Sequence, residues 1–112
     1  MKPNVPEVSV GELKQLLASE KPPRLVDVRE KEEWEACRIS GAELIPLSLW
    51  PQLATEKLTD KDEPLLMQCH HGGRSARATA YLLGQGYTNV RNVAGGIDAW
   101  SIEIDPSVPR YE

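Results

Sequence analysis

The chain has 112 residues, of which 40% are hydrophobic and 27% charged, and its formal net charge is −4 at pH 7. This length and composition suit one globular domain over residues 1–112. The acidic balance argues against a nucleic-acid-binding protein or a polybasic membrane-binding segment, and no apolar run approaches the roughly 18 residues that span a bilayer. Because Met1–Asn4 lacks the apolar segment of a signal peptide, we expect a cytoplasmic protein that binds neither nucleic acid nor membrane.

Strand and helix patterns alternate through the first half of the chain. Ser9 and Glu12 have the spacing of a capping box and predict a helix that stops near Ser19, ahead of two prolines. A later helix is expected over residues 47–54, where Pro51 either lies in the first turn or restarts the helix. The other elements expected here are strands over 7–10, 24–29 and 42–45, and a helical turn over 30–36 with Trp34 facing inward.

The second half continues the alternation, with Arg91 a candidate to lean from its strand toward a pocket. The expected elements are a strand over 65–68, a helix over 75–85, a strand over 90–93 and a helix over 97–100. The proline-rich tail, 105–112, is expected to be irregular and either wraps the domain or leads away from it. This order predicts an α/β three-layer sandwich: a mostly parallel five-stranded sheet with helices on both faces.

The segment from Leu65 to Ser75 carries the candidate chemistry. An apolar strand ends at Cys69, a loop of two histidines and two glycines follows, and a helix begins near Arg74. Loop amides and the helix N-terminus would stabilise a thiolate, which is the nucleophilic form of cysteine. We therefore predict that Cys69 is the catalytic nucleophile. The predicted substrate-binding residues are His70, His71, Gly72, Gly73, Arg74 and Ser75.

Each of these loop residues has an expected contribution. Gly72 and Gly73 permit the positive φ angles that turn amides inward, and the planar fork of Arg74 suits an oxyanion. The two histidines either add positive charge when protonated or lie exposed, and exposure is favoured for at least one of them. The alternative interpretation of Cys69 is a plain buried cysteine, since free cysteines are among the most buried residues.

Three other polar or reactive residues are interpreted as structural. Asp27 and Arg29 end a central strand near the predicted site, where structural hydrogen bonds are favoured over a catalytic role. Cys37 lies in a polar stretch without a glycine loop behind it. The two cysteines form neither a disulfide framework nor a zinc pattern, and adjacent histidines on a tight loop rarely share one metal. We expect no metal and no other cofactor.

The loop Cys69–Ser75 resembles the active-site loop of the rhodanese (sulfurtransferase) family, whose pattern is Cys-x-x-Gly-x-Arg-Ser/Thr. Nearly the whole chain shares this resemblance. The other matching segments are Leu25–Arg29 (Asp-x-Arg), Ile39–Ala42 followed by Ile45-Pro46 (Ile-x-Gly-Ala…Ile-Pro), and Gly95–Trp100 (Gly-Gly-x-x-x-Trp). The segment 104–111 is similar to rhodanese domains at the C-terminus of sulfur-carrier-activating adenylyltransferases.

The resemblance implies a rhodanese-like fold and a thiosulfate sulfurtransferase. Cys69 would take the outer sulfur of thiosulfate or a similar small anionic donor as a persulfide and pass it to cyanide, a thiol or a sulfur-carrier protein. The protein would act as a monomer or homodimer. The chain departs from the family pattern at Cys37-Arg38, where Gly-His is common, and at His70, often arginine or lysine in thiosulfate users, so donor preference stays open.

Two alternatives belong to other functional classes. Phosphatases and arsenate reductases also place a cysteine and an arginine around an oxyanion, but they resemble Cys-x5-Arg, whereas four residues separate Cys69 from Arg74 here. A rhodanese-like module for protein interaction or sulfur-carrier binding often lacks the cysteine, which this chain keeps. Both comparisons favour sulfur transfer.

Overall fold

The computed structural model describes residues 2–111 and contains one five-stranded sheet in which all neighbouring strands are parallel. The strand order is β1-β5-β4-β2-β3. The strands are β1 (Glu7–Val8), β2 (Arg24–Asp27), β3 (Glu43–Leu44), β4 (Leu65–Gln68) and β5 (Val90–Val93). The helices are α1 (Val10–Leu17), α2 (Lys31–Ala36), the 3₁₀ turn η1 (Leu47–Leu49), α3 (Gln52–Lys57), α4 (Gly73–Gly84) and α5 (Gly96–Glu103).

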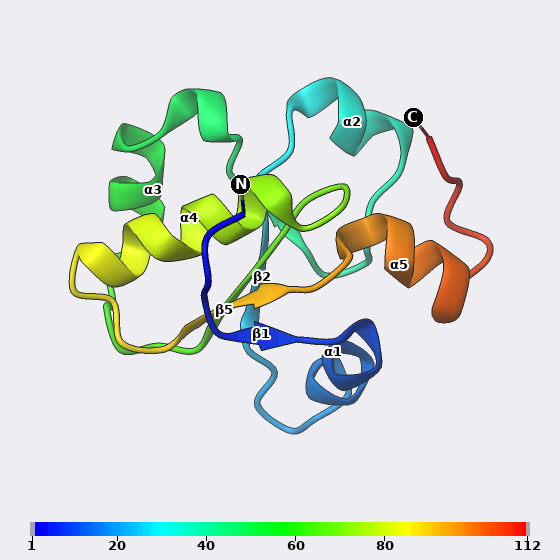
Figure 1. The fold of residues 1–112 in the computed structure, drawn as a ribbon, viewed down its shortest axis with the longest axis horizontal. Coiled ribbons are helices and arrows are strands. Elements are labelled where there is room, and N and C mark those ends of the chain that lie inside the picture. The colour runs from blue at the N-terminus through cyan, green and yellow to red at the C-terminus, as the bar shows by residue number, and fades with distance from the viewer. Residues whose placement is uncertain (1, 112) are drawn as a thin grey trace.

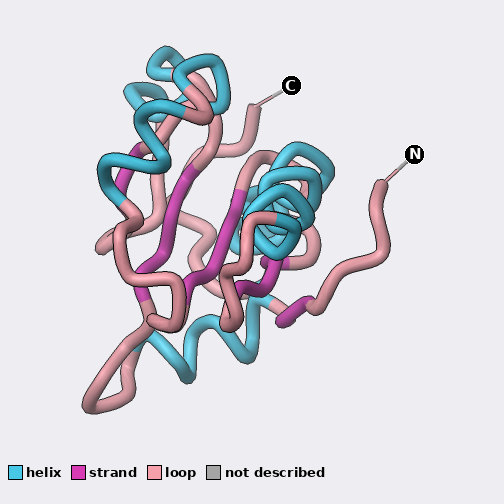
Figure 2. Tube along the Cα trace, turned by 90° about the vertical axis from the view of Figure 1, so that its left-hand side faces the viewer, coloured by secondary structure: helices cyan, strands magenta, loops and turns pink. Residues whose placement is uncertain are grey.

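Helices cover both faces of this sheet, as Figures 1 and 2 show. One face packs against α3 and α4 through a core cluster that includes Met67, Ala78 and Leu82. The other face packs against α1 and α5 through a second cluster that includes Leu13 and Ile97. Because the central strands are buried on both faces, they read as continuous apolar runs rather than as alternating ones. The predicted three-layer α/β sandwich is confirmed.

Local sequence signals explain most helix boundaries. The capping box forms as predicted: the Glu12 amide donates to Ser9 Oγ (3.1 Å) and the Ser9 amide to Glu12 Oε1 (2.9 Å). The helix expected over 47–54 is divided, because Pro51 restarts it as the N-cap of α3. The expectation for Trp34 was wrong. This side chain is only half-buried and lies under the Arg38 guanidinium, 5.0 Å from the ring centroid, outside both core clusters.

The C-terminal tail wraps the domain over residues 105–111, and residue 112 of the expected irregular tail lies outside the described residues. In Figure 1 it runs from α5 back toward the end of α2. Val108 and Tyr111 pack against the second core cluster, and the Ser101 hydroxyl donates to the carbonyl oxygen of Val108. None of the helices in residues 2–111 combines the length and hydrophobicity needed to cross a bilayer.

The parallel strands bring their carboxyl ends to one edge of the sheet. Asp27 of β2 is in register with Gln68 of β4, and Met67 of β4 is in register with Asn92 of β5. In open α/β sheets this edge is where ligands bind. The loop after β4, which begins with Cys69, therefore lies at the position that the fold offers to a ligand.

Candidate active site

Cys69 is a buried free cysteine whose sulfur faces the start of α4. Its Sγ accepts hydrogen bonds from the amides of Gly72 (3.1 Å) and Ser75 (3.4 Å), and the Ser75 hydroxyl lies 3.3 Å away. These donors belong to the N-cap and first turn of a twelve-residue helix, where the amides have no partner within the helix. The positive end of the helix dipole and the two amides together favour negative charge on this sulfur.

The turn of the loop depends on Gly72. Its φ is +100°, and a Cβ there would meet the amide nitrogen of Gly95 at 3.2 Å, so both backbone angle and space require glycine. The expectation of a positive φ at Gly73 was wrong. Gly73 is the first residue of α4, and a Cβ there would have nothing within 4 Å. One left-handed residue is sufficient, since the helix itself turns the following amides toward the sulfur.

The first turn of α5 holds the backbone of the loop. The amides of Ile97 and Asp98 donate to the carbonyl oxygens of Cys69 (2.8 Å) and His70 (3.0 Å). A Cβ at Gly96 would overlap both of these carbonyl groups, so the approach needs a residue without a side chain. The two helices therefore have different tasks: α4 presents amides to the sulfur and α5 binds the carbonyl groups of the loop.

Asn92 of β5 is a site residue that sequence reasoning missed. Its Oδ1 accepts from Ser75 Oγ (2.5 Å), and its Nδ2 donates to the Gly72 carbonyl oxygen (3.1 Å) and to Glu7 Oε2 (2.8 Å). Arg91 was the expected candidate, but strand alternation turns neighbouring residues to opposite faces, and Asn92 is the buried one. A polar residue at a buried strand position was the signal available in the sequence.

Arg74 makes a bidentate ion pair with Glu33 of α2. The Nη1–Oε1 and Nη2–Oε2 distances are 2.7 and 2.8 Å. This pairing, helped by a hydrogen bond from Tyr111, lowers the pKa of Glu33 to about 2 although burial opposes the shift. The guanidinium fork, expected to face an oxyanion, is thus occupied by a protein carboxylate. Arg74 ties the first turn of α4 to α2.

The two histidines of the loop differ in environment. His71 is exposed, whereas His70 is half-buried and its ring stacks on Tyr111, with centroids 4.0 Å apart and planes 10° from parallel. Burial, and then the charge of His71, lower the pKa of His70 below its usual value of 6.5. The lowered pKa favours the neutral form of His70.

Asp27 and Arg29 are fully buried and pair with each other. Arg29 Nη2 donates to Asp27 Oδ2 (2.7 Å) and to the Cys37 carbonyl oxygen (2.8 Å), and its Nη1 donates to the Tyr111 hydroxyl (3.0 Å). All of these partners are protein groups. Cys37 itself is buried beside Arg29, with Nη1 3.9 Å from its sulfur.

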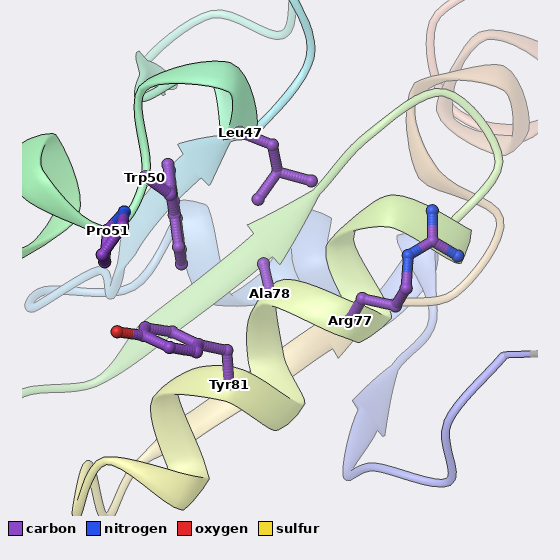
Figure 3. Close-up of a pocket in the computed structure, with 6 residues that line it drawn as sticks. All are labelled: Leu47, Trp50, Pro51, Arg77, Ala78 and Tyr81. Carbon is purple, nitrogen blue, oxygen red and sulfur yellow. The ribbon is translucent and has the colours of Figure 1, made fainter.

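An open groove of about 350 Å³ lies beside α4. Figure 3 shows it with Trp50 and Tyr81 toward one end and Arg77 toward the other, above Ala78. In the part of the chain that the structure describes, no three His, Cys, Asp or Glu side chains gather as metal ligands would. At the loop, the structure presents a cysteine sulfur within a ring of hydrogen-bond donors.

The chain is similar to known proteins in sequence and in fold. The model of the rhodanese-like domain family matches residues 9–103. Among curated relatives, the Arabidopsis thaliana rhodanese-like/PpiC domain-containing protein 12, chloroplastic, is 37% identical over 91 residues, covering 79% of this chain and 30% of that protein. The Zea mays adenylyltransferase and sulfurtransferase MOCS3-1 is 32% identical over 114 residues, covering 97% of this chain and 24% of that protein.

Solved structures agree with the sequence comparisons. The human single-domain sulfurtransferase TSTD1 is 35% identical with a TM-score of 0.74, and the match covers 89% of this chain and 98% of that one. The chain spans less than a third of the length of the two curated relatives and nearly all of this structural neighbour. Since the family model covers most of the chain, including the Cys69 loop, α4 and α5, the chain belongs to the rhodanese-like domain family.

Proposed function

We propose that this protein is a sulfurtransferase that carries sulfane sulfur as a persulfide on Cys69. The observation that carries the proposal is the ring of donors around Cys69 Sγ, formed by the amides of Gly72 and Ser75 and the Ser75 hydroxyl. A thiolate and a persulfide anion have the same need for such donors. Kinship with proteins named sulfurtransferases supports the same reaction class.

In the first half-reaction the Cys69 thiolate attacks the outer sulfur of thiosulfate or a similar small anionic donor. A bond forms between Sγ and that sulfur, while the bond from that sulfur to the sulfonate breaks, and its electron pair leaves with sulfite. The negative charge of the product lies on the terminal sulfur, within reach of the loop amides from His70 to Ser75. Arg74 holds the first turn of α4 in place through Glu33 while this happens.

In the second half-reaction a nucleophilic acceptor attacks the terminal sulfur of the persulfide. With cyanide, a carbon–sulfur bond forms, the sulfur–sulfur bond breaks, and thiocyanate leaves as the Cys69 thiolate returns. A thiol acceptor attacks in the same way and becomes a persulfide itself. No external oxidant or reductant is needed, because the sulfur moves between nucleophiles without net oxidation.

We propose a thiol, including that of a sulfur-carrier protein, as the acceptor in the cell. The relative named an adenylyltransferase and sulfurtransferase supports this choice, and its similarity extends over 97% of this chain. Three statements stay predictions from the sequence: that residues 1–112 act as one domain, that the protein is a monomer or homodimer, and that it is cytoplasmic.

The test is intact-mass spectrometry after reduced protein is mixed with thiosulfate, for wild type, Cys69→Ala and Cys37→Ala. Wild type and Cys37→Ala should gain one sulfur (~32 Da), which cyanide then removes, whereas Cys69→Ala should gain none. Cys37→Ala is the matched control, because Cys37 is the other buried free cysteine. An adduct that survives Cys69→Ala would contradict the proposal, as would no adduct with thiosulfate or with mercaptopyruvate.

A further inference from the structure

We propose that Tyr111, in the C-terminal tail, is a positioning residue for the persulfide loop. It holds the loop from outside through two contacts, a ring stacked on His70 and a hydroxyl bound to the carboxylate that fixes Arg74. This inference rests on the proposed sulfur transfer at Cys69. It adds the tail, which lies more than 30 residues beyond the loop in sequence, to the machinery that sets the loop geometry.

The hydroxyl of Tyr111 joins two ion pairs. It donates to Glu33 Oε2 (2.7 Å) and accepts from Arg29 Nη1 (3.0 Å). Glu33 in turn holds Arg74, while Arg29 is anchored on the fully buried Asp27. A continuous chain of hydrogen bonds thus runs from the end of β2, through the tail, to the first turn of α4. Loss of the hydroxyl would leave Glu33 Oε2 bound to Arg74 alone, with only the Glu30 amide (3.1 Å to Oε1) still holding the carboxylate, so its angle and that of Arg74 would be less restrained.

The ring of Tyr111 acts on the loop itself. His70 directly follows Cys69, and the near-parallel stack leaves little freedom for the imidazole. The imidazole Nε2 is buried and has no hydrogen-bond partner among the described residues, so stacking and burial hold this side of the ring. Since α5 binds the carbonyl oxygens of Cys69 and His70, both the backbone of the loop and the His70 ring are restrained.

The tail is itself secured close to Tyr111. Ser101 of α5 donates to the Val108 carbonyl oxygen, and Arg110 pairs with Asp98 of α5, with an Nε–Oδ1 distance of 2.9 Å. Ile104 and Val108 pack against the core cluster on the α1 and α5 face. Tyr111 is therefore presented to the loop by an ordered segment, which is what a positioning residue requires.

The experiment compares Tyr111→Phe, Tyr111→Leu and the control Tyr81→Phe in the full chain. Tyr81 is exposed on α4 and contacts Trp50 rather than the Cys69 loop. Tyr111→Phe keeps the stack but not the hydroxyl, and should lower kcat for thiosulfate–cyanide transfer roughly tenfold, the lower end of what one hydrogen bond to a charged group contributes. Tyr111→Leu loses both contacts and should lower kcat roughly 50-fold, because a small misplacement of reacting groups is that costly. KM for thiosulfate should change little.

A double-mutant cycle separates positioning from general destabilisation. Because the hydroxyl is inferred to act through Glu33, Tyr111→Phe should have no further effect on kcat in a Glu33→Gln background, whereas an independent structural effect would multiply. Equal kcat in wild type, Tyr111→Phe and Tyr111→Leu would overturn the proposal. If Tyr111→Leu fails to fold, Tyr111→Phe and the cycle still decide, since phenylalanine fits the same space.

The NMR titration of His70 gives a readout that does not depend on sulfur transfer. Its pKa is held low by burial and by His71, against the raising effects of Asp98, of a backbone hydrogen bond with Tyr111 that both variants keep, and of Glu33. Loss of the ring that buries His70 in Tyr111→Leu should therefore raise the pKa toward 6.5, while Tyr111→Phe leaves it nearly unchanged. An unmoved titration in Tyr111→Leu would contradict the stack as a restraint on the loop. Wild type that forms no persulfide would overturn the proposed function instead, with this titration still testing Tyr111.

Discussion

Glu33 occupies both nitrogens of the Arg74 fork, at 2.7 and 2.8 Å, and so ties α2 to the first turn of α4. An arginine two residues after a glycine turn is naturally interpreted as a ligand for an oxyanion, and that was the expectation here. In the structure the fork is bound to a carboxylate of the same chain. The electropositive character around Cys69 then comes chiefly from backbone amides and the dipole of α4.

The first prediction concerns the acid stability that this ion pair provides. The pKa of Glu33 falls from 4.5 to about 2 on folding, chiefly through its hydrogen bonds with Arg74. A lowered carboxyl pKa contributes stability that is fully present above pH 4.5 and is lost as pH falls toward 2. The melting temperature of wild type should therefore fall across this pH window more than that of Glu33→Gln, which has no titrating group at position 33.

Glu35→Gln is the matched control, since Glu35 is an exposed glutamate on the same helix. Its unfolding profile should follow wild type between pH 4.5 and 2. A Glu33→Gln profile that falls as steeply as wild type would contradict the assignment of this acid-sensitive stability to the Glu33–Arg74 pair.

The second prediction uses two neighbouring glycines as a matched pair. Gly72→Ala places a side chain at φ +100° and 3.2 Å from the Gly95 amide, so the loop must shift, and we expect a loss of about 1–3 kcal/mol in unfolding free energy. Gly73→Ala has open space at the first turn of a helix and should be neutral or gain up to about 1 kcal/mol. Urea unfolding of both variants measures the difference, and equal losses would refute the inferred division of roles.

The third prediction concerns the hydrogen bonds that Asn92 makes with Ser75 and Gly72 of the Cys69 loop. Asn92→Ala leaves Ser75 Oγ and the Gly72 carbonyl oxygen without this partner, and should reduce the unfolding free energy by about 2–3 kcal/mol and slow persulfide formation. Ser75→Ala keeps the Ser75 amide on the sulfur and should have the smaller effect on that rate. Urea unfolding measures the unfolding free energy. Mass spectrometry of samples quenched at set times after thiosulfate addition measures the rate of persulfide formation.

Asn89→Ala serves as the control for Asn92→Ala, because its side chain is exposed just before β5. Its stability should stay within about 0.5 kcal/mol of wild type. If Asn92→Ala matched that small change, the hydrogen bonds of Asn92 would not be what holds the loop.

The contiguous part of the site was predictable and the distant part was not. Cys69 to Ser75 lie within seven residues, and an apolar strand, a glycine turn and a helix start are each visible in local sequence. Glu33, Asn92 and Tyr111 reach the loop only through the fold. The spacing of hydrophobic residues indicates which face of a helix or strand a residue occupies, but it does not indicate which distant side chain that residue contacts. The contacts of Glu33, Asn92 and Tyr111 with the loop therefore needed the structure.

The fold followed from the same local signals, with informative exceptions. Alternating strands and helices require a parallel sheet, and that topology was confirmed. The failure at Trp34 has a physical reason: α2 buries none of its residues, so the large apolar side chain there is covered by Arg38 instead of the core. The split at Pro51 was one of two outcomes that proline chemistry allows.

The last prediction concerns Gln68, the final residue of β4 and the neighbour of Cys69. Its side chain is fully buried, and neither its amide oxygen nor its nitrogen has a hydrogen-bond partner within residues 2–111. A buried polar group without a partner costs about 1–3 kcal/mol, and an apolar replacement of similar shape avoids that cost. Gln68→Met should therefore raise the unfolding free energy by about 1 kcal/mol, whereas the exposed control Gln85→Met should change it by less than about 0.5 kcal/mol. Destabilisation by Gln68→Met in urea unfolding would instead mean that the amide is satisfied by a buried water, which makes about three hydrogen bonds and is costly to remove.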